Sequence, residues 1–219
     1  MGNSTASASS STTGATPAPP KVTIDYKPLK FDSLKSGDVV LALHHYVPDT
    51  CEVFHWMIYF HLGNGGYILH ALLFQVSDNP DDPFYWKFEA KPHTLDTPKL
   101  AYARLLGNMS GLNATNFLNF AAVIKEKVPV PYIPRDESPT PRFSCSIWAA
   151  NFIKHAKKEK YITLPYSVEQ LRKEMLGKAS SQAQKVMEKC KCTTTPRGTR
   201  YTFSGYKPLL EYMVVNTVT

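Results

Sequence analysis

The 219-residue chain lacks any apolar run of the roughly eighteen residues that a membrane-spanning helix needs. Its N-terminus also lacks the basic segment followed by an apolar segment that marks a secretory signal. These two absences predict a soluble, cytoplasmic protein. In that reducing compartment the four cysteines are expected to be thiols rather than partners in disulfides.

Metal-ligating residues are few and poorly spaced. Cys190 and Cys192 form a Cys-x-Cys pair, but two further ligands of compatible spacing are missing nearby. His44 and His45 are adjacent rather than three or four residues apart, and are best explained as surface or core residues. The sequence therefore predicts no metal site and indicates no cofactor.

The chain also lacks the motifs of a nucleic-acid-binding protein, despite a net charge of +7. Its basic clusters, residues 154–160 and 185–200, carry neither a groove-reading motif nor the regularly interleaved aromatic residues that stack on bases. We interpret the clusters as solvated surface, and leave open a weak contact with an acidic membrane surface.

Residues 1–21 are almost all Ser, Thr, Ala, Pro and Gly, a composition that buries too little apolar surface to offset chain entropy. We predict a disordered tail there. The remainder, residues 22–219, is the right size for one domain, and the chain is 43% hydrophobic and 12% aromatic.

Strand patterns dominate the first half of this domain. Gly37-Asp38 is a turn before an apolar run that predicts a strand from Val39, and a second strand covers about residues 53–62. Asn64-Gly65 separates that strand from the apolar run 67–74, which is a strong hairpin signal. Residues 39–74 are therefore predicted to form an antiparallel meander. Four prolines make the stretch that follows a loop, with one strand near residues 85–88.

Helical patterns dominate the second half. Residues 114–126 place apolar groups on one helical face. Five prolines make 128–142 a long irregular connection, of the kind that covers binding sites. A helix then begins at Cys145 with Ser144 as its cap, and another covers about 167–190 with Ser167 as its cap. Residues 199–218 fit either strands or a short closing helix.

Cys145 and His55 are the candidates for chemistry. A thiol at a helix N-terminus has its pKa lowered from about 8.5 to roughly 3.5–7.5, because free backbone N–H groups favour the thiolate. The same groups can stabilise an oxyanion. His55 lies in the strand 53–62 on the face opposite its apolar residues, where it can meet a helix terminus and act as a base.

His70, on the partner strand, is the candidate that would orient His55. If Asn64-Gly65 is a two-residue loop, Tyr59 lies opposite His70, and His55 is then roughly 13 Å further along its strand. That distance is too long for a hydrogen bond. A bulge or a longer loop between His61 and Gly66 would shift the register and bring the two imidazoles together.

Several short segments resemble the circularly permuted NlpC/P60 papain-like superfamily, in its lecithin retinol acyltransferase-like branch. They are Gly37-Asp38-Val39-Val40, His55-Trp56-Met57-Ile58-Tyr59, Tyr67-Ile68-Leu69-His70 after a Gly-containing turn, and the Cys145 helix. The resemblance covers about residues 35–160. It implies an α+β fold, with a small antiparallel sheet packed on helices, and a catalytic triad of Cys145, His55 and His70.

We therefore predict a cysteine-dependent hydrolase or acyltransferase that acts on an amide or ester through a thioester on Cys145. Trp56, Tyr59, Ser144 and Trp148 are predicted to contact a small-molecule, lipid or peptide acyl substrate. The alternative is a non-catalytic binding module that keeps the fold and buries Cys145 beside Trp148 and Phe152.

Overall fold

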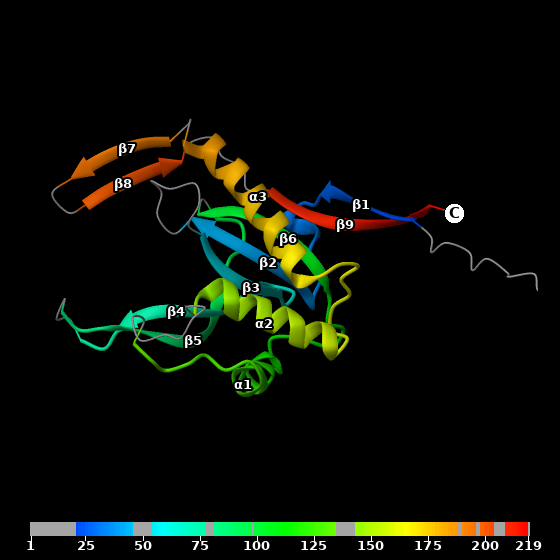
Figure 1. Cartoon of the computed structure of the whole chain (residues 1–219), viewed down its shortest axis with the longest axis horizontal. Coiled ribbons are helices and arrows are strands. Elements are labelled where there is room, and N and C mark those ends of the chain that lie inside the picture. The colour runs from blue at the N-terminus through cyan, green and yellow to red at the C-terminus, as the bar shows by residue number, and fades with distance from the viewer. Residues whose placement is uncertain are drawn as a thin grey trace, which may run out of the picture.

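A computed structural model describes residues 21–45, 54–77, 81–97, 99–134, 143–187, 190–195, 198–203 and 209–218. Within these ranges the chain is a mixed α and β structure (Figure 1). A seven-stranded sheet has the order β1-β9-β6-β2-β3-β4-β5, and β7 and β8 pair separately. The strands are β1 (Lys21–Pro28), β2 (Asp38–His45), β3 (Phe54–His61), β4 (Gly66–Gln75), β5 (Phe84–His93), β6 (Leu100–Asn108), β7 (Cys190–Thr195), β8 (Gly198–Phe203) and β9 (Leu209–Val218). The predicted tail lies outside the described residues, apart from Lys21.

The predicted meander is confirmed, since β2 pairs antiparallel with β3 and β3 with β4. The loop between these strands is longer than the two residues Asn64-Gly65. His61 pairs with Gly66, so four residues, 62–65, connect the strands, with Gly63 at a φ of 93° that favours glycine. Gly66 lies beneath the Tyr59 ring, and an added Cβ there would approach the ring to 2.2 Å. The longer loop shifts the register by two residues, so that Tyr59 faces Ile68.

The sheet is larger than the small one predicted, and it is not wholly antiparallel. The expected short strand near residues 85–88 is the ten-residue β5, which includes Pro92. Proline is tolerated because β5 is an edge strand and no neighbour needs its missing N–H. β6 falls where a loop was expected, and β9 pairs parallel with β6 and antiparallel with β1.

Three α-helices accompany the sheet in the described part of the chain: α1 (Phe117–Lys127), α2 (Cys145–Lys158) and α3 (Val168–Met187), with a 3-10 turn, η1 (Phe31–Ser33), after β1. Both predicted caps are confirmed. Ser144 Oγ accepts from Ile147 N at 3.3 Å, and Ser167 Oγ accepts from Gln170 N at 3.1 Å. Of the predicted connection 128–142, residues 135–142 lie outside the described ranges, as do 46–53 before β3.

The sheet is buried on both faces along β2 and β3. One face packs against the helices, and its core holds the alternate β3 residues Phe54, Trp56, Ile58 and Phe60, and Leu62 directly after the strand, as predicted. The other face holds a smaller cluster that includes Met57, Tyr59 and Ile68. The apolar side of β3 therefore fixes α2 against the sheet, and with it the position of Cys145.

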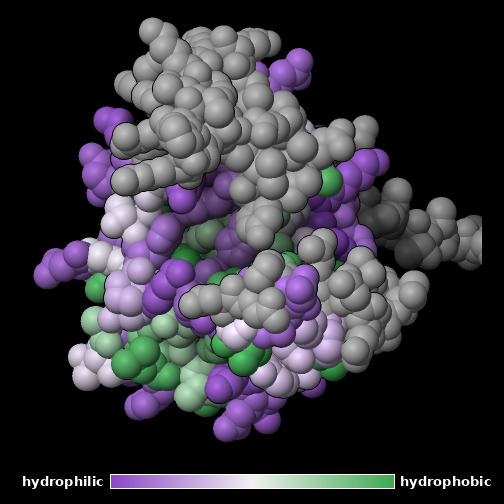
Figure 2. All heavy atoms as spheres, turned by 90° about the vertical axis from the view of Figure 1, so that its left-hand side faces the viewer, coloured by the Kyte–Doolittle hydropathy of each residue, from purple (hydrophilic) through white to green (hydrophobic). Residues whose placement is uncertain are grey.

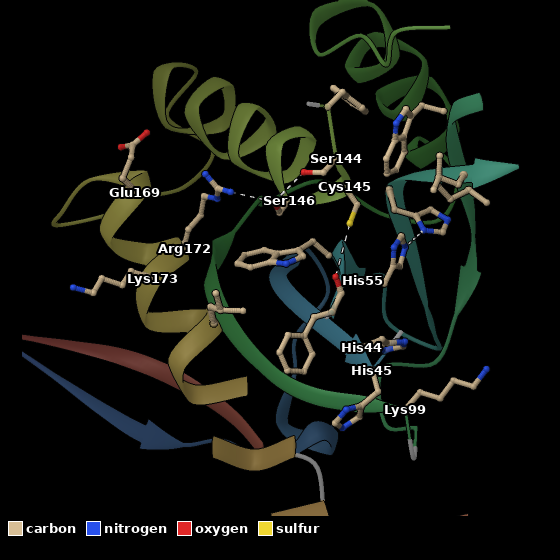
Figure 3. Close-up of a pocket in the computed structure, with 18 residues that line it drawn as sticks. His44, His45, His55, Lys99, Ser144, Cys145, Ser146, Glu169, Arg172 and Lys173 are labelled. Carbon is tan, nitrogen blue, oxygen red and sulfur yellow. Dashed lines mark hydrogen bonds between the residues drawn. The ribbon is translucent and has the colours of Figure 1, made fainter. Parts of the chain in front are cut away.

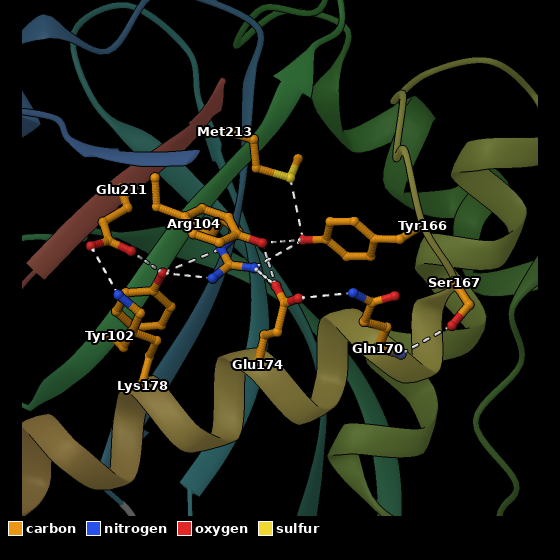
Figure 4. A network of polar contacts seen from close by, with 10 residues as sticks. Tyr102, Arg104, Tyr166, Ser167, Gln170, Glu174, Lys178, Glu211 and Met213 are labelled. Atoms are coloured by element: carbon orange, nitrogen blue, oxygen red, sulfur yellow. Dashed lines mark hydrogen bonds and ion pairs between the residues drawn. The ribbon is translucent and has the colours of Figure 1, made fainter. Parts of the chain in front are cut away.

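A polar network around Arg104 holds α3 to the closing strands (Figure 4). Arg104 on β6 is fully buried, and its guanidinium donates to the hydroxyls of Tyr102 and Tyr166 and pairs with Glu174 on α3 at 3.0 Å. Tyr102 in turn donates to Glu211 on β9 at 2.6 Å. The network fixes the side of α3 that faces the sheet, and so positions the first turns of the helix next to α2.

Among the described helices none is both long and apolar enough to cross a bilayer. Some large hydrophobic side chains are nevertheless exposed, and Figure 2 shows a hydrophobic area on the lower half of one face, the half in which β4, β5 and α1 lie in Figure 1. The exposed residues on or near these elements are Val76, Phe84, Leu118, Val123 and Tyr132.

Candidate active site

Cys145 is the first residue of α2, directly after the cap Ser144. Because the first turn of a helix has N–H groups without helical partners, the thiol lies where backbone donors gather. The Cys145 Sγ contacts the Phe54 carbonyl oxygen of β3 at 3.9 Å, and the backbone N–H groups of Trp56 and Ser146 also favour its thiolate. The sulfur therefore lies against the β3 backbone and contacts the two residues that flank His55, Phe54 and Trp56.

His55 and His70 form a direct hydrogen bond, with His55 Nε2 and His70 Nδ1 2.6 Å apart. The four-residue loop accounts for it. With Ile58 opposite Leu69, His55 lies about two residues diagonal to His70 on the same face, rather than four residues away. The predicted pairing of the two imidazoles is thus present, and the obstacle raised by a two-residue loop is absent.

Glu89 extends this pair into a chain of three side chains. It lies opposite His70 in the β4–β5 register, and its Oε2 is 2.9 Å from His70 Nε2. Lys91, two residues further along β5, also contacts the Glu89 carboxylate. Glu89 was not predicted as a site residue, because the sequence indicates only a short strand near residues 85–88, with no register relative to β4.

The pKa shifts of His55, His70 and Glu89 determine which of these three side chains is charged. Burial lowers the pKa of His55 to about 3, with the charges of His70 and Lys91 acting in the same direction. Burial also lowers the pKa of His70, against the opposing effect of its hydrogen bond to Glu89. For Glu89, burial alone would raise the pKa, but the contacts of Lys91 and His70 lower it to about 2. Two neutral imidazoles and one carboxylate result at neutral pH.

The thiol departs from the expectation for a helix N-terminus. Burial raises the pKa of Cys145, and this effect outweighs the backbone N–H groups of Trp56, Ser146 and Cys145 itself, which lower it. The predicted lowering of this pKa, which took only the helix terminus into account, is wrong. The resting pair is therefore a neutral thiol and a neutral imidazole.

These groups line one cavity of about 1040 Å³ (Figure 3). It opens where β3 and β4 separate, since their pairing ends at Ile58 and Leu69 although both strands continue. Cys145, His55 and His70 all line it. Its apolar walls are formed by Phe54, Trp56, Leu72, Leu73, Trp86, Phe143 and Leu176.

Two of the predicted substrate-binding residues, Trp56 and Ser144, line this cavity. The other two, Tyr59 and Trp148, are not among its lining residues. Tyr59 belongs to the cluster on the far face of the sheet, and its hydroxyl is 3.2 Å from His61 Nδ1. Trp148 is fully buried in the main core, where its Nε1 donates to the Val128 carbonyl at 3.1 Å.

Other residues of the cavity were not predicted to belong to a site. His44 and His45, interpreted above as surface or core residues, line the cavity beside Lys99, and His44 is buried against the His93 ring at 5.1 Å between centroids. Arg172 and Lys173 reach it from α3. Arg172 and Lys173 were not predicted because two consecutive basic residues in a helix do not by themselves indicate a binding site. No group of three His, Cys, Asp or Glu side chains suited to a metal ion occurs in the described ranges.

Comparison with known proteins identifies no relative: no family model, no curated protein and no solved structure matches this chain. The chemistry of the cavity must therefore be inferred from its own residues.

Proposed function

We propose that the protein is a thiol-dependent hydrolase or acyltransferase that forms a thioester on Cys145, in a permuted papain-like arrangement. The observation that carries the proposal is the chain from Glu89 through His70 to His55, which ends in the cavity that Cys145 also lines. Nucleophilic catalysis by a thiol needs a base close to it and a group that orients the base.

Hydrogen-bond roles along this chain leave His55 with the free lone pair it needs. The ionised Glu89 carboxylate only accepts, so His70 carries its proton on Nε2. His70 Nδ1 then accepts from His55 Nε2. His55 Nδ1 remains unprotonated and is the atom that would take the proton of the Cys145 thiol.

In the proposed reaction, the Cys145 sulfur attacks the acyl carbonyl while its proton passes to His55. The bond from the carbonyl carbon to the leaving nitrogen or oxygen then breaks, and His55 returns the proton to the leaving group. Water, an amine or an alcohol attacks the thioester next, again through His55, and restores the thiol. Backbone N–H groups of Trp56, Cys145 and Ser146 are the candidate donors to the oxyanion.

Intact mass spectrometry after incubation with p-nitrophenyl acetate tests this proposal. One acetyl group per chain should appear, and neutral hydroxylamine should remove it, as it does from a thioester. Cys145→Ala should abolish this adduct, and His55→Ala should slow its formation at least a hundredfold. Lys158→Met, at the far end of α2, is the control that should leave the rate unchanged.

The binding-module alternative draws support from the raised pKa of Cys145, which is the state of an inert buried thiol. Under that alternative, acetylation would spread over Cys51, Cys190 and Cys192 and leave Cys145 unmodified. It would also be unaffected by His55→Ala. Peptide mapping of the acetylated chain distinguishes the two functions.

A further inference from the structure

The cavity has a cationic wall that the proposed reaction does not use. Arg172 and Lys173 line it from α3, and Figure 3 shows Arg172 and His55 on opposite sides of Cys145. The proposed base thus lies on one side of the sulfur and a guanidinium on the other.

Arg172 is held close to the nucleophile by a hydrogen bond. Its Nη2 donates to Ser146 Oγ at 3.1 Å, and Ser146 directly follows Cys145. Its Nε is buried and has no hydrogen-bond partner in the described part of the chain. No carboxylate of the described residues forms an ion pair with it. The carboxylate of Glu169, which also lines the cavity, interacts with the charge of Arg172 but forms its ion pair with Lys154, at 2.9 Å.

A second buried donor in the same cavity has no acceptor. Trp86 is only 7% exposed, and its Nε1 finds no hydrogen-bond partner among the described residues. Buried polar groups in folded proteins are nearly always paired, so unpaired donors in a cavity are free to bind an acceptor on water or on a ligand that displaces it. Two such donors beside apolar walls fit a ligand with a hydrocarbon part and an oxygen-rich, anionic part.

We propose that the substrate carries a carboxylate or phosphate in its leaving group, a few bonds from the scissile carbonyl, and that Arg172 and Lys173 bind this anion. This inference rests on the proposed thiol chemistry. Because Arg172 is bonded to the residue after Cys145, the anion must lie near the bond that breaks. The acyl chain then occupies the apolar part of the cavity, next to Trp56 and Leu73.

Alkylation of Cys145 tests the anion site without a substrate. Iodoacetate and iodoacetamide differ little except in charge, and each alkylates a thiol by forming an S–C bond with loss of iodide. We expect the ratio of the two rates at Cys145, measured by peptide mapping on the full chain, to exceed the same ratio for glutathione about tenfold or more. Arg172→Met should remove most of this excess and leave the smaller part that Lys173 contributes.

Three variants make this result specific to charge at residue 172. Arg172→Lys should keep part of the preference for iodoacetate, and Lys158→Met should keep all of it. Ser146→Ala removes the hydrogen bond to Arg172 but leaves the cation, so it should also retain the preference. A native ratio equal to that of glutathione, or a raised ratio that Arg172→Met leaves unchanged, overturns the inference.

A matched series of amides tests the same site with acyl compounds: N-dodecanoylethanolamine is neutral, N-dodecanoylglycine carries a carboxylate, and N-dodecanoyl-O-phosphoethanolamine carries a phosphate. We expect kcat/KM to be about tenfold to a hundredfold higher for one of the anionic compounds, and Arg172→Met to remove this advantage. The better anion identifies the leaving group. If p-nitrophenyl acetate acylates Cys145 but neither anion is preferred, this inference fails and the proposed function stands.

Discussion

Glu89 is the residue through which the proposed mechanism can be tested most directly, because it touches neither the thiol nor the space beside it. Glu89→Gln keeps the size of the side chain and an acceptor oxygen for His70, but removes the negative charge. The charge matters at the moment when His55 takes the thiol proton and becomes positive. The variant should therefore slow acylation without unfolding the protein.

The size of the effect follows from the geometry of the chain. The two hydrogen bonds, 2.6 and 2.9 Å long, and the His70 ring between them place the Glu89 carboxylate about 8 Å from His55 Nε2. Two unit charges at that distance interact by about 2 kcal/mol at an effective dielectric constant of about 20. This corresponds to about thirtyfold in rate.

The assay is single-turnover acylation of Cys145 by p-nitrophenyl acetate, and its rate is monitored through the p-nitrophenolate that acylation releases. Lys91→Met is the matched control, because the Lys91 charge lowers the pKa of His55 whereas the Glu89 charge raises it. Acylation should slow in Glu89→Gln and stay equal or quicken in Lys91→Met. Equal rates in Glu89→Gln and the native protein would show that the chain from Glu89 to His55 has no part in proton transfer.

Three further outcomes concern stability, each measured by urea unfolding. Gly66→Ala should destabilise the protein by about 1–3 kcal/mol, because its Cβ would meet the Tyr59 ring at 2.2 Å, and an unchanged midpoint would contradict the observed β3–β4 register. Arg104→Met should cost about 1–3 kcal/mol, because it leaves the partly exposed Glu174 carboxylate and the hydroxyls of Tyr102 and Tyr166 without their cation. Burial lowers the pKa of His44 to about 3, so the unfolded chain binds a proton that the folded chain does not between about pH 6.5 and 3. Stability should fall as the pH drops through that window, and His44→Asn should reduce the slope at pH 5 by about 1.4 kcal/mol per pH unit.

Local signals in the sequence were sufficient for the helices and the meander. Ser144 and Ser167 are predicted as caps because each hydroxyl comes directly before an apolar, helix-periodic run, and both accept the expected backbone hydrogen bond. The alternation along β3 likewise identifies which residues face the helices. Such features depend only on residues within a few positions of one another.

Features that depend on pairing between distant segments were not predicted. β6 is buried on both faces and contains the fully buried Arg104, so it shows neither alternation nor a wholly apolar run. β9 pairs with β1 and β6 from the far end of the chain. Glu89 can bond to His70 only because the β4–β5 register places the two residues opposite each other. The candidate site was thus predictable as Cys145, His55 and His70, while Glu89 depends on the register of β5 against β4.

The direction of the Cys145 pKa links these observations. A helix N-terminus alone would favour a resting thiolate, but the same packing that fixes α2 against β3 also leaves Cys145 only partly exposed, and burial has the larger effect on its pKa. A neutral thiol needs a base that is itself neutral, and burial holds His55 in that state at physiological pH. Because both groups start uncharged, charge appears in the proposed reaction only as the sulfur attacks. The fixed charges of Glu89 and Arg172, on opposite sides of Cys145 and His55, would then act on the transition state more than on the resting protein.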